Sequence, residues 1–375
     1  MELQTLVDYL IKDDTFKGII TNRFAQFGIP EQRAYLGATL FPEKTDIPIT
    51  NQFRESFIRY RSPIANASTR YSPPQFKGGT LVGSMLIELT ESDIASEFDA
   101  GEYDTLINLL VTVPNNAPVE DVPEQALLIV LNWFDKTITR PLVEYNEKMI
   151  WDCLVDAQVV GKGDNGFQIT IDYLNNSGQR VQAGGNWSDP TYDPFPDIIA
   201  MVTSMTDAGF KVSRLIASTK VATALQGNPK IAARIGILNI TSSVVAGLPG
   251  YVSFDALNNL FAANSLPPIE KYDLQFQTQT GTGRFLKEDV LVMIPSTDRD
   301  VEILSPDAAV WQLNGTLGYV GVGRPTNRNE NGRAFTVKYE DGKAAPVTAT
   351  GWQTSLPVNM FPDGIRVITD VFNVL

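Results

Sequence analysis

Three aspartates stand four residues apart in GGNWSDPTYDPFPDI, the stretch that covers residues 184–198. Asp189, Asp193 and Asp197 are carboxylates of the kind that bind calcium or act as an acid–base pair. An EF-hand loop needs a central glycine and a bidentate Glu at its twelfth position, and neither fits this stretch. Asp193 also stands where a helix N-cap belongs, and Pro194 where the first helical residue belongs. The pattern therefore favours a structural role over a metal site.

Other chemistry is limited by what the chain lacks. It contains no histidine, which removes Ser-His-Asp and Cys-His nucleophiles and the usual zinc sites. Cys153 is the only cysteine and falls on an apolar helical stripe, so we expect a core residue and no disulfide. The glycines of TGTGRF, at 281 and 283, lack the phosphate-loop patterns and indicate a loop. A glycosidase that uses two carboxylates stays open, because such pairs have no fixed spacing.

Composition indicates a folded chain and disfavours a role that binds nucleic acid or spans a membrane. Hydrophobic residues make up 43% of the 375 residues and charged residues 19%. A net charge of -13 disfavours binding to nucleic acid, which Lys and Arg normally lead. The N-terminus has no signal-peptide pattern. The most apolar run, residues 126–134, is shorter than the roughly 20 residues that span a bilayer.

Residues 122–160 carry the strongest helical pattern. Apolar side chains recur there at steps of three or four, at Leu127, Leu131, Phe134, Ile138, Leu142, Tyr145, Met149 and Cys153. Asp121 and Glu124 resemble a capping box. We predict one long helix that is kinked at Pro141 and ends before Gly161.

Residues 49–90 alternate with period two and predict two strands, joined by a long polar connection that projects as an extended loop. Basic and acidic side chains fall in two successive stretches of the sequence here. The basic side chains are Arg54, Arg59, Arg61, Arg70 and Lys77, and the acidic ones that follow include Glu91, Asp93, Glu97 and Asp99. Solvated surface is the ordinary explanation for such runs. The functional hypothesis is that the basic loop of one subunit lies over the acidic segment of the next.

The second half of the chain predicts mixed α and β structure. Residues 167–174 and 179–182 flank the turn NNSG and predict a hairpin, and residues 210–335 alternate short strands and helices. We expect strands at 212–218 and 289–295 and helices at 218–225 and 254–263. The last segment, 336–375, is β-rich.

The order of these elements resembles the major capsid protein of tailed phages, and in detail the lambda-type major capsid protein E family. The most specific local match is Gly184, Gly185, Trp187, Tyr192, Asp193 and Pro194, which resembles the family's linker into its central domain. The resemblance implies an α+β chain with the Hong Kong 97-like capsid fold. Its parts would be an N-terminal arm at 1–48, an extended loop at 49–105, a peripheral domain at 106–187 with the spine helix at 122–160, an axial domain at 188–335, and a return to the peripheral domain at 336–375.

The function implied is that of the major coat protein of a tailed double-stranded DNA phage. Copies of the chain would self-assemble through hexamers and pentamers into an icosahedral head, in the host cytoplasm, and enclose DNA without sequence-specific binding. Scaffold, portal and decoration proteins are further candidate partners; no catalytic site, cofactor or metal is expected. The alternative is the shell protein of an encapsulin-like nanocompartment, and a carboxylate-dependent glycoside hydrolase is the distant one. Segment 184–198 is then interpreted as a joint between domains.

Overall fold

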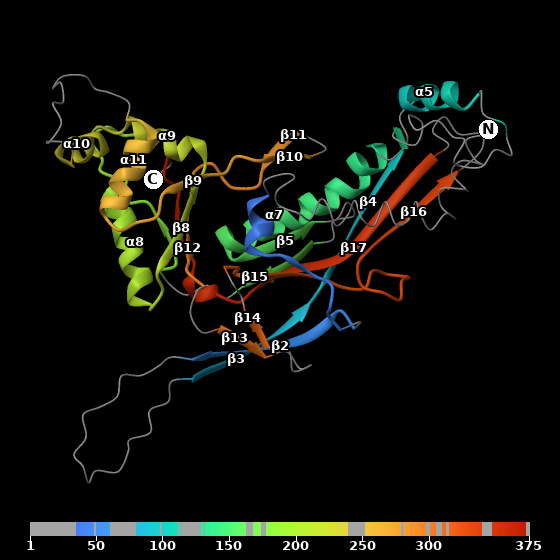
Figure 1. Cartoon of the computed structure of the whole chain (residues 1–375), viewed down its shortest axis with the longest axis horizontal. Coiled ribbons are helices and arrows are strands. Elements are labelled where there is room, and N and C mark those ends of the chain that lie inside the picture. The colour runs from blue at the N-terminus through green and yellow to red at the C-terminus, as the bar shows by residue number, and fades with distance from the viewer. Residues whose placement is uncertain are drawn as a thin grey trace, which may run out of the picture. The chain divides into compact units, whose positions relative to one another are not determined.

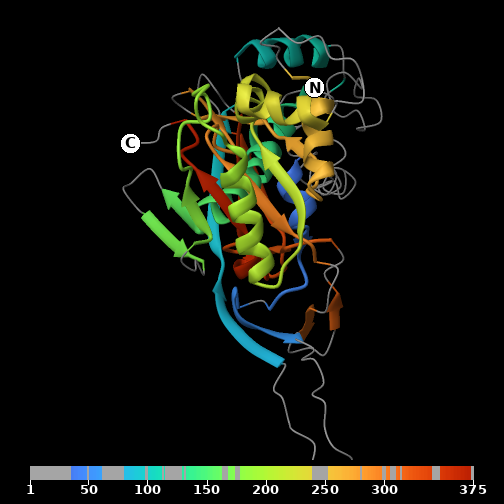
Figure 2. The ribbon, with the colours of Figure 1, turned by 90° about the vertical axis from the view of Figure 1, so that its left-hand side faces the viewer.

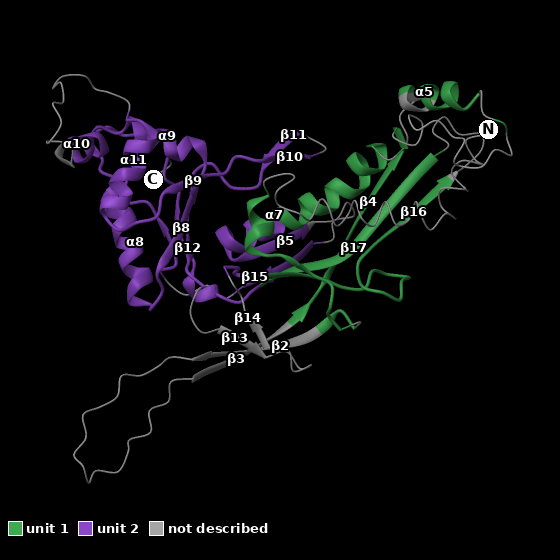
Figure 3. Cartoon of the chain, viewed as in Figure 1, with its two compact units in different colours: residues 1–55, 85–148, 319–358 green, residues 56–84, 149–318, 359–375 purple. Residues whose placement is uncertain are grey.

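A computed structural model of the chain divides into two compact units (Figures 1 and 3). Unit 1 comprises residues 1–55, 85–148 and 319–358, and unit 2 comprises residues 56–84, 149–318 and 359–375. The structure describes residues 35–48, 50–60, 80–97, 100–111, 114, 129–130, 132–162, 168–173, 178–238, 252–278, 281–297, 301–304, 310–312, 315–339 and 347–372. The chain passes between the units at 55/56, 84/85, 148/149, 318/319 and 358/359. The domain bounds expected at 187/188 and 335/336 stay predictions.

Unit 1 is built on a five-stranded sheet with strand β17 inside it. The order is β1, β15, β17, β16, and β4 also pairs with β17. The strands are β1 (Glu43–Lys44), β15 (Gly318–Val322), β17 (Val347–Asn359), β16 (Arg333–Tyr339) and β4 (Thr90–Glu97). β17 alternates buried and half-buried residues in its first half and is wholly buried in its second. Helix α5 (Ala100–Leu110) follows β4.

The spine helix differs from the prediction at its end and near its proline. A π-helical turn, η2 (Asp135–Thr139), leads directly into helix α7 (Arg140–Asp156). Pro141 has no N–H and its ring crowds the preceding turn, and a π turn relieves both conflicts. The helix ends at Asp156, not at residue 160, because strand β5 (Gln158–Lys162) begins there. The expected capping box at 121–124 lies outside the described residues.

The helix packs closely on β17 in unit 1. Ile138 and Leu142 are buried, and a Cβ on Gly351 of β17 would collide with the Ile138 side chain. Only a glycine therefore allows this approach of helix and strand.

Part of the N-terminal arm belongs to unit 1. The short helix α4 (Leu36–Leu40) has its backbone N–H groups at Gly37 and Ala38 bonded to the Glu147 carboxylate of α7, at 2.8 and 3.0 Å. Glu43 of β1 pairs with Arg333, whose side chain is 7% exposed. Residues 35–48 thus pack on their own unit, and residues 1–34 lie outside the description.

Unit 2 is built on a second five-stranded sheet. Its order is β7 (Arg180–Gln182), β18 (Arg366–Thr369), β12 (Leu291–Pro295), β8 (Val212–Ala217) and β9 (Ile269–Lys271). The helices are α8 (Phe195–Asp207), α9 (Thr219–Gly227), α10 (Pro229–Leu238) and α11 (Phe254–Ala263). Figure 2 shows α8 alongside this sheet, and a shared apolar core includes Ile198, Leu215, Leu225, Phe261 and Met293. The strands and helices predicted for 212–218, 218–225, 254–263 and 289–295 are confirmed within one or two residues.

Two strand pairings in unit 2 differ from the predictions. β6 (Gln168–Asp172) pairs with β5, whereas β7 pairs in parallel with β18, so 167–182 is not one hairpin. The glycines at 281 and 283 lie in strand β11 (Gly281–Arg284), which pairs with β10 (Gln275–Thr278), and not in a loop. A Cβ on Gly283 would collide with the Phe276 ring, which explains a glycine in a strand.

The two strands expected between 49 and 90 are present as β2 (Gln52–Tyr60) and β3 (Thr80–Glu88). They belong to a four-stranded sheet with β13 (Val301–Leu304) and β14 (Val310–Gln312). The connection between β2 and β3, residues 61–79, lies outside the described residues.

Candidate assembly site

One face of β4 carries the described part of the predicted acidic segment. Glu91, Asp93 and Glu97 occupy alternate positions and are exposed, because the strand's other face packs inward with period two. β4 is held on β17 from Thr90↔Ser355 to Glu97↔Thr348. Glu91 is partly engaged within unit 1, since its carboxylate accepts hydrogen bonds from the Thr326 N–H and hydroxyl. Asp99 lies outside the described residues.

The structure describes only part of the basic side of the predicted contact. Arg54 and Arg59 are placed on β2 by their backbone, and their side chains lie outside the description. Arg61, Arg70 and Lys77 fall in the undescribed connection. The proposed contact between subunits therefore stays a hypothesis.

The residues of segment 184–198 come together around one carboxylate. Asp197 accepts hydrogen bonds from the Gly184 N–H at 3.2 Å, the Trp187 indole N–H at 3.1 Å and the Tyr192 hydroxyl at 2.8 Å. Trp187 is fully buried. Partial burial, followed by the bond to Asp197, raises the pKa of Tyr192 to about 12. The aspartate is thus a structural acceptor.

Gly184 and Gly185 are required by close packing. A Cβ on Gly184 would stand 2.6 Å from the Tyr192 hydroxyl, and one on Gly185 would overlap the Tyr192 ring. Neither glycine is among the residues with positive φ, so both serve close approach and not an unusual dihedral angle.

Asp193 and Pro194 begin helix α8 one residue later than expected. Pro194 is the N-cap, and the Asp193 carboxylate accepts from the Phe195 N–H at 3.1 Å. The other oxygen of Asp193 pairs with Arg234 of α10 at 2.5 Å. Asp189 closes its own turn: hydrogen bonds from Thr191, first from the backbone and then from the side chain, lower the pKa of its carboxyl.

Asn228 fixes the same segment and was missed by sequence reasoning. Its amide donates to the carbonyl oxygens of Trp187, Asp189 and Tyr192, at 3.0 to 3.3 Å. The only sequence signal is an Asn before Pro229, which ordinarily marks a turn. All of these residues lie inside unit 2. These bonds therefore hold the segment in place within that unit.

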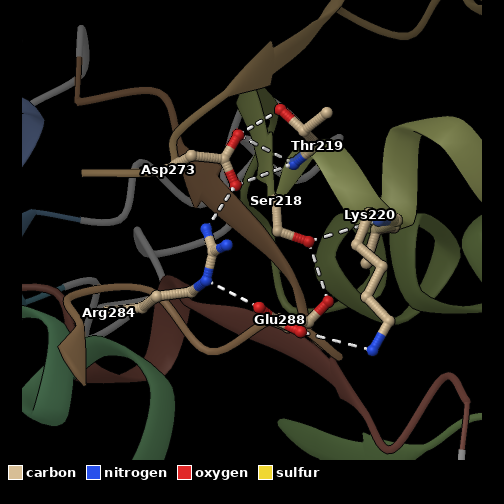
Figure 4. A network of polar contacts seen from close by, with 7 residues as sticks. Ser218, Thr219, Lys220, Asp273, Arg284 and Glu288 are labelled. Atoms are coloured by element: carbon tan, nitrogen blue, oxygen red, sulfur yellow. Dashed lines mark hydrogen bonds and ion pairs between the residues drawn. The ribbon is translucent and has the colours of Figure 1, made fainter. Parts of the chain in front are cut away.

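A second polar network surrounds the start of helix α9 (Figure 4). Arg284 bridges Asp273 at 3.1 Å and Glu288 at 2.6 Å, and Lys220 reaches Glu288 at 3.2 Å. Asp273 also accepts from the Thr219 N–H. Opposite charges balance within the cluster, and such partly exposed pairs contribute about 0–1 kcal/mol each. The cluster anchors the base of the β10–β11 hairpin.

Cys153 is buried as predicted. Its side chain is 0% exposed, and burial raises the pKa of the thiol to about 12. A thiol held neutral is a poor nucleophile. Burial likewise raises the pKa of Tyr173 beside it.

The described residues hold no group of three Asp, Glu or Cys side chains arranged for a metal ion. Nor does any helix among the described residues have the length and hydropathy to cross a bilayer.

Comparison with known proteins gives the family and the fold. Residues 134–318 match the model of the family described as phage major capsid protein E. No curated protein matches the chain. Among solved structures, a protein assigned as the capsid protein of an Escherichia coli CFT073 prophage superposes with a TM-score of 0.55 at 14% identity, over 93% of this chain and 98% of that one. A phage-related protein of Bordetella bronchiseptica RB50 gives 0.51 at 13% identity, over 94% and 97%.

The family pattern covers α7 and most of unit 2, while the structural likeness extends over nearly the whole chain. Residues 134–318 therefore match the phage major capsid protein E family, and the chain has the Hong Kong 97-like capsid fold.

Proposed function

We propose that this chain is the major coat protein of a tailed double-stranded DNA phage, which assembles through hexamers and pentamers into an icosahedral head. The family match over residues 134–318 carries the proposal, together with a capsid fold that extends over 93% of the chain. Both belong to structural proteins, which favours a role without catalysis over a carboxylate-dependent hydrolase. The net charge of -13 suits a container that holds DNA with its counterions. Scaffold, portal and decoration proteins are proposed as further partners.

The helix-covered sheet of unit 2 is proposed as the axial domain, which meets its copies at hexamer and pentamer centres. The proposed joint at 184–194 would then act as a stiff connection. Its support is the set of bonds to Asp197 and Asn228, which leaves little freedom within the segment.

Electron microscopy tests the main proposal. Recombinant chain, alone and with scaffold candidates, would be examined by negative stain and by sedimentation. Polyhedral shells, or rings of five and six, are expected. Shells that enclose a cellular protein instead of DNA in the native source would favour the nanocompartment, and a lasting monomer would overturn both.

The contact between the basic loop and the acidic face of β4 is proposed to hold neighbouring subunits together. Charge reversal at Arg59 and Arg61 should impair assembly and leave the subunit folded, as judged by circular dichroism. Reversal at Asp93 and Glu97 should impair it equally. Combining both reversals should restore shells if the two surfaces meet, because the attraction is then rebuilt with opposite signs.

A further inference from the structure

Two arginines of unit 1 share one surface pocket. The pocket has a volume of about 490 Å³ and is lined by Asn51 and by residues 324–329, which include Arg324 and Arg328. These residues belong to the loop between β15 and β16. None of the described residues that line the pocket carries a carboxylate. Their side chains are three amides, one hydroxyl, one proline ring and the two guanidinium groups.

The walls of the pocket are rigid. The Asn51 amide donates to the Arg324 carbonyl at 2.7 Å and accepts from the Arg324 N–H at 2.8 Å. A Cβ on Gly323 would collide with Asn51 and Leu89, which keeps the loop tight against its support. Across the loop, the Trp352 indole donates to the Thr326 carbonyl at 3.0 Å. A ligand would thus meet a site formed in advance.

The positive charge in the pocket is left without a carboxylate partner in the described part of the chain. Arg324 is half-buried and its guanidinium makes no hydrogen bond there. Arg328 is exposed, donates one bond to the Phe335 carbonyl at 3.0 Å and lies 5.9 Å from the Trp352 ring centre. Glu91, the nearby acid, is bonded to Thr326. Two planar forks of N–H donors therefore face a polar pocket, a combination that fits an oxyanion.

Four other arginines behave differently. Each of the following is paired with an acid of its own unit: Arg214 with Glu270, Arg234 with Asp193, Arg284 with Asp273 and Glu288, and Arg333 with Glu43. Arg324 and Arg328 have no such acidic partner among the described residues.

We propose that this pocket binds a carboxylate side chain from a second copy of the chain. The proposal rests on the shell function above, in which each subunit contacts neighbouring copies. A second copy offers mainly acids, because the chain has 43 Asp and Glu against 30 Lys and Arg. The phosphodiester of enclosed DNA is the competing oxyanion, and a net charge of -13 disfavours a tight grip on it.

Phenylglyoxal, which modifies arginine, tests occupancy of the pocket directly. Arg324 and Arg328 should react in unassembled subunits and be protected in shells that contain no DNA, as read by mass spectrometry. Equal reactivity in both states would overturn the proposal. Protection only in DNA-filled shells would also overturn it and assign the pocket to the phosphodiester.

Substitution tests the contribution of the charge. Arg324→Gln should lower shell formation on the order of tenfold at fixed subunit concentration and weaken its dependence on salt. Arg324→Lys should retain part of the assembly. Lys338→Gln is the matched control, since it removes one exposed positive charge of β16 outside the pocket. Near-ultraviolet circular dichroism checks that each subunit is folded.

The outcomes separate the two proposals. A wild-type chain that never associates overturns the shell function and the pocket proposal together. Wild-type shells with Arg324→Gln shells of equal yield and salt resistance overturn only the pocket proposal.

Discussion

Segment 184–198 of unit 2 and the surface around β4 of unit 1 are both rich in charge, but they use it in opposite ways. In unit 2, Asp197 and Asp193 are satisfied by groups of the same unit. In unit 1, Asp93 and Glu97 are exposed on β4, and Arg324 lines an open pocket. The difference teaches where to look for assembly: charges that are paired internally hold the fold, and charges that are left over are available to another copy.

We expect the largest loss of stability from a substitution inside segment 184–198. Trp187→Ala removes a fully buried indole and its bond to Asp197. We expect a loss of about 3–5 kcal/mol in the free energy of unfolding, measured by guanidinium titration of the unassembled subunit. Trp352→Ala, which removes a half-exposed indole of unit 1, is the control and should cost less. Equal losses of stability in the two variants would contradict the interpretation that segment 184–198 is held in place within unit 2.

The second-largest effect should be a fall in the free energy of unfolding at high pH. Burial holds the Cys153 pKa at about 12, above its ordinary value near 9. Because the folded-state pKa is raised, the neutral thiol's contribution is complete below pH 9 and is lost as pH rises toward 12. At pH 10.5 the loss should be about 2 kcal/mol. Cys153→Ala should flatten the pH slope relative to wild type, and parallel slopes would count against this account.

Asp197→Asn and Asp189→Asn compare the stability contributions of two aspartates within unit 2. The amide offers one acceptor oxygen where the carboxylate offered two, so one of the three donors loses its partner. We expect a cost of about 1–3 kcal/mol, read as a shift of the thermal midpoint. Asp189→Asn alters a fully exposed turn that is closed locally, and should cost less. A reversed order would contradict the ranking.

The smallest change in stability should come from the exposed face. Asp93→Asn combined with Glu97→Gln should alter the free energy of unfolding by less than about 0.5 kcal/mol. The yield of shells should nevertheless fall, because the face would have lost its charge for a neighbour. Normal shells from this variant would break the comparison.

Local sequence patterns predicted the helices and strands well. They predicted poorly which strands pair and which residues bond to each other. The helix at 254–263 was predicted with its correct ends because Ser253 caps it and its apolar residues repeat every three to four positions. The hairpin at 167–182 was wrong because β6 and β7 are both genuine strands whose partners are set by long-range packing. Likewise, the Asp193 cap was nearly right, whereas the bonds from Asn228 depend on a helix far along the chain. Nothing local marks an amide for such a role.

The late position of β17 and β18 in the chain also sets the timing of synthesis. β17 lies inside the unit 1 sheet and pairs with β4, and β18 lies between β7 and β12 in unit 2. Residues 347–369 therefore leave the ribosome after every other strand of both sheets has been made. Such distant pairings form slowly, and neither sheet can close earlier. A nascent chain thus presents no finished surface for other copies, so shells should recruit only subunits whose translation has passed this point.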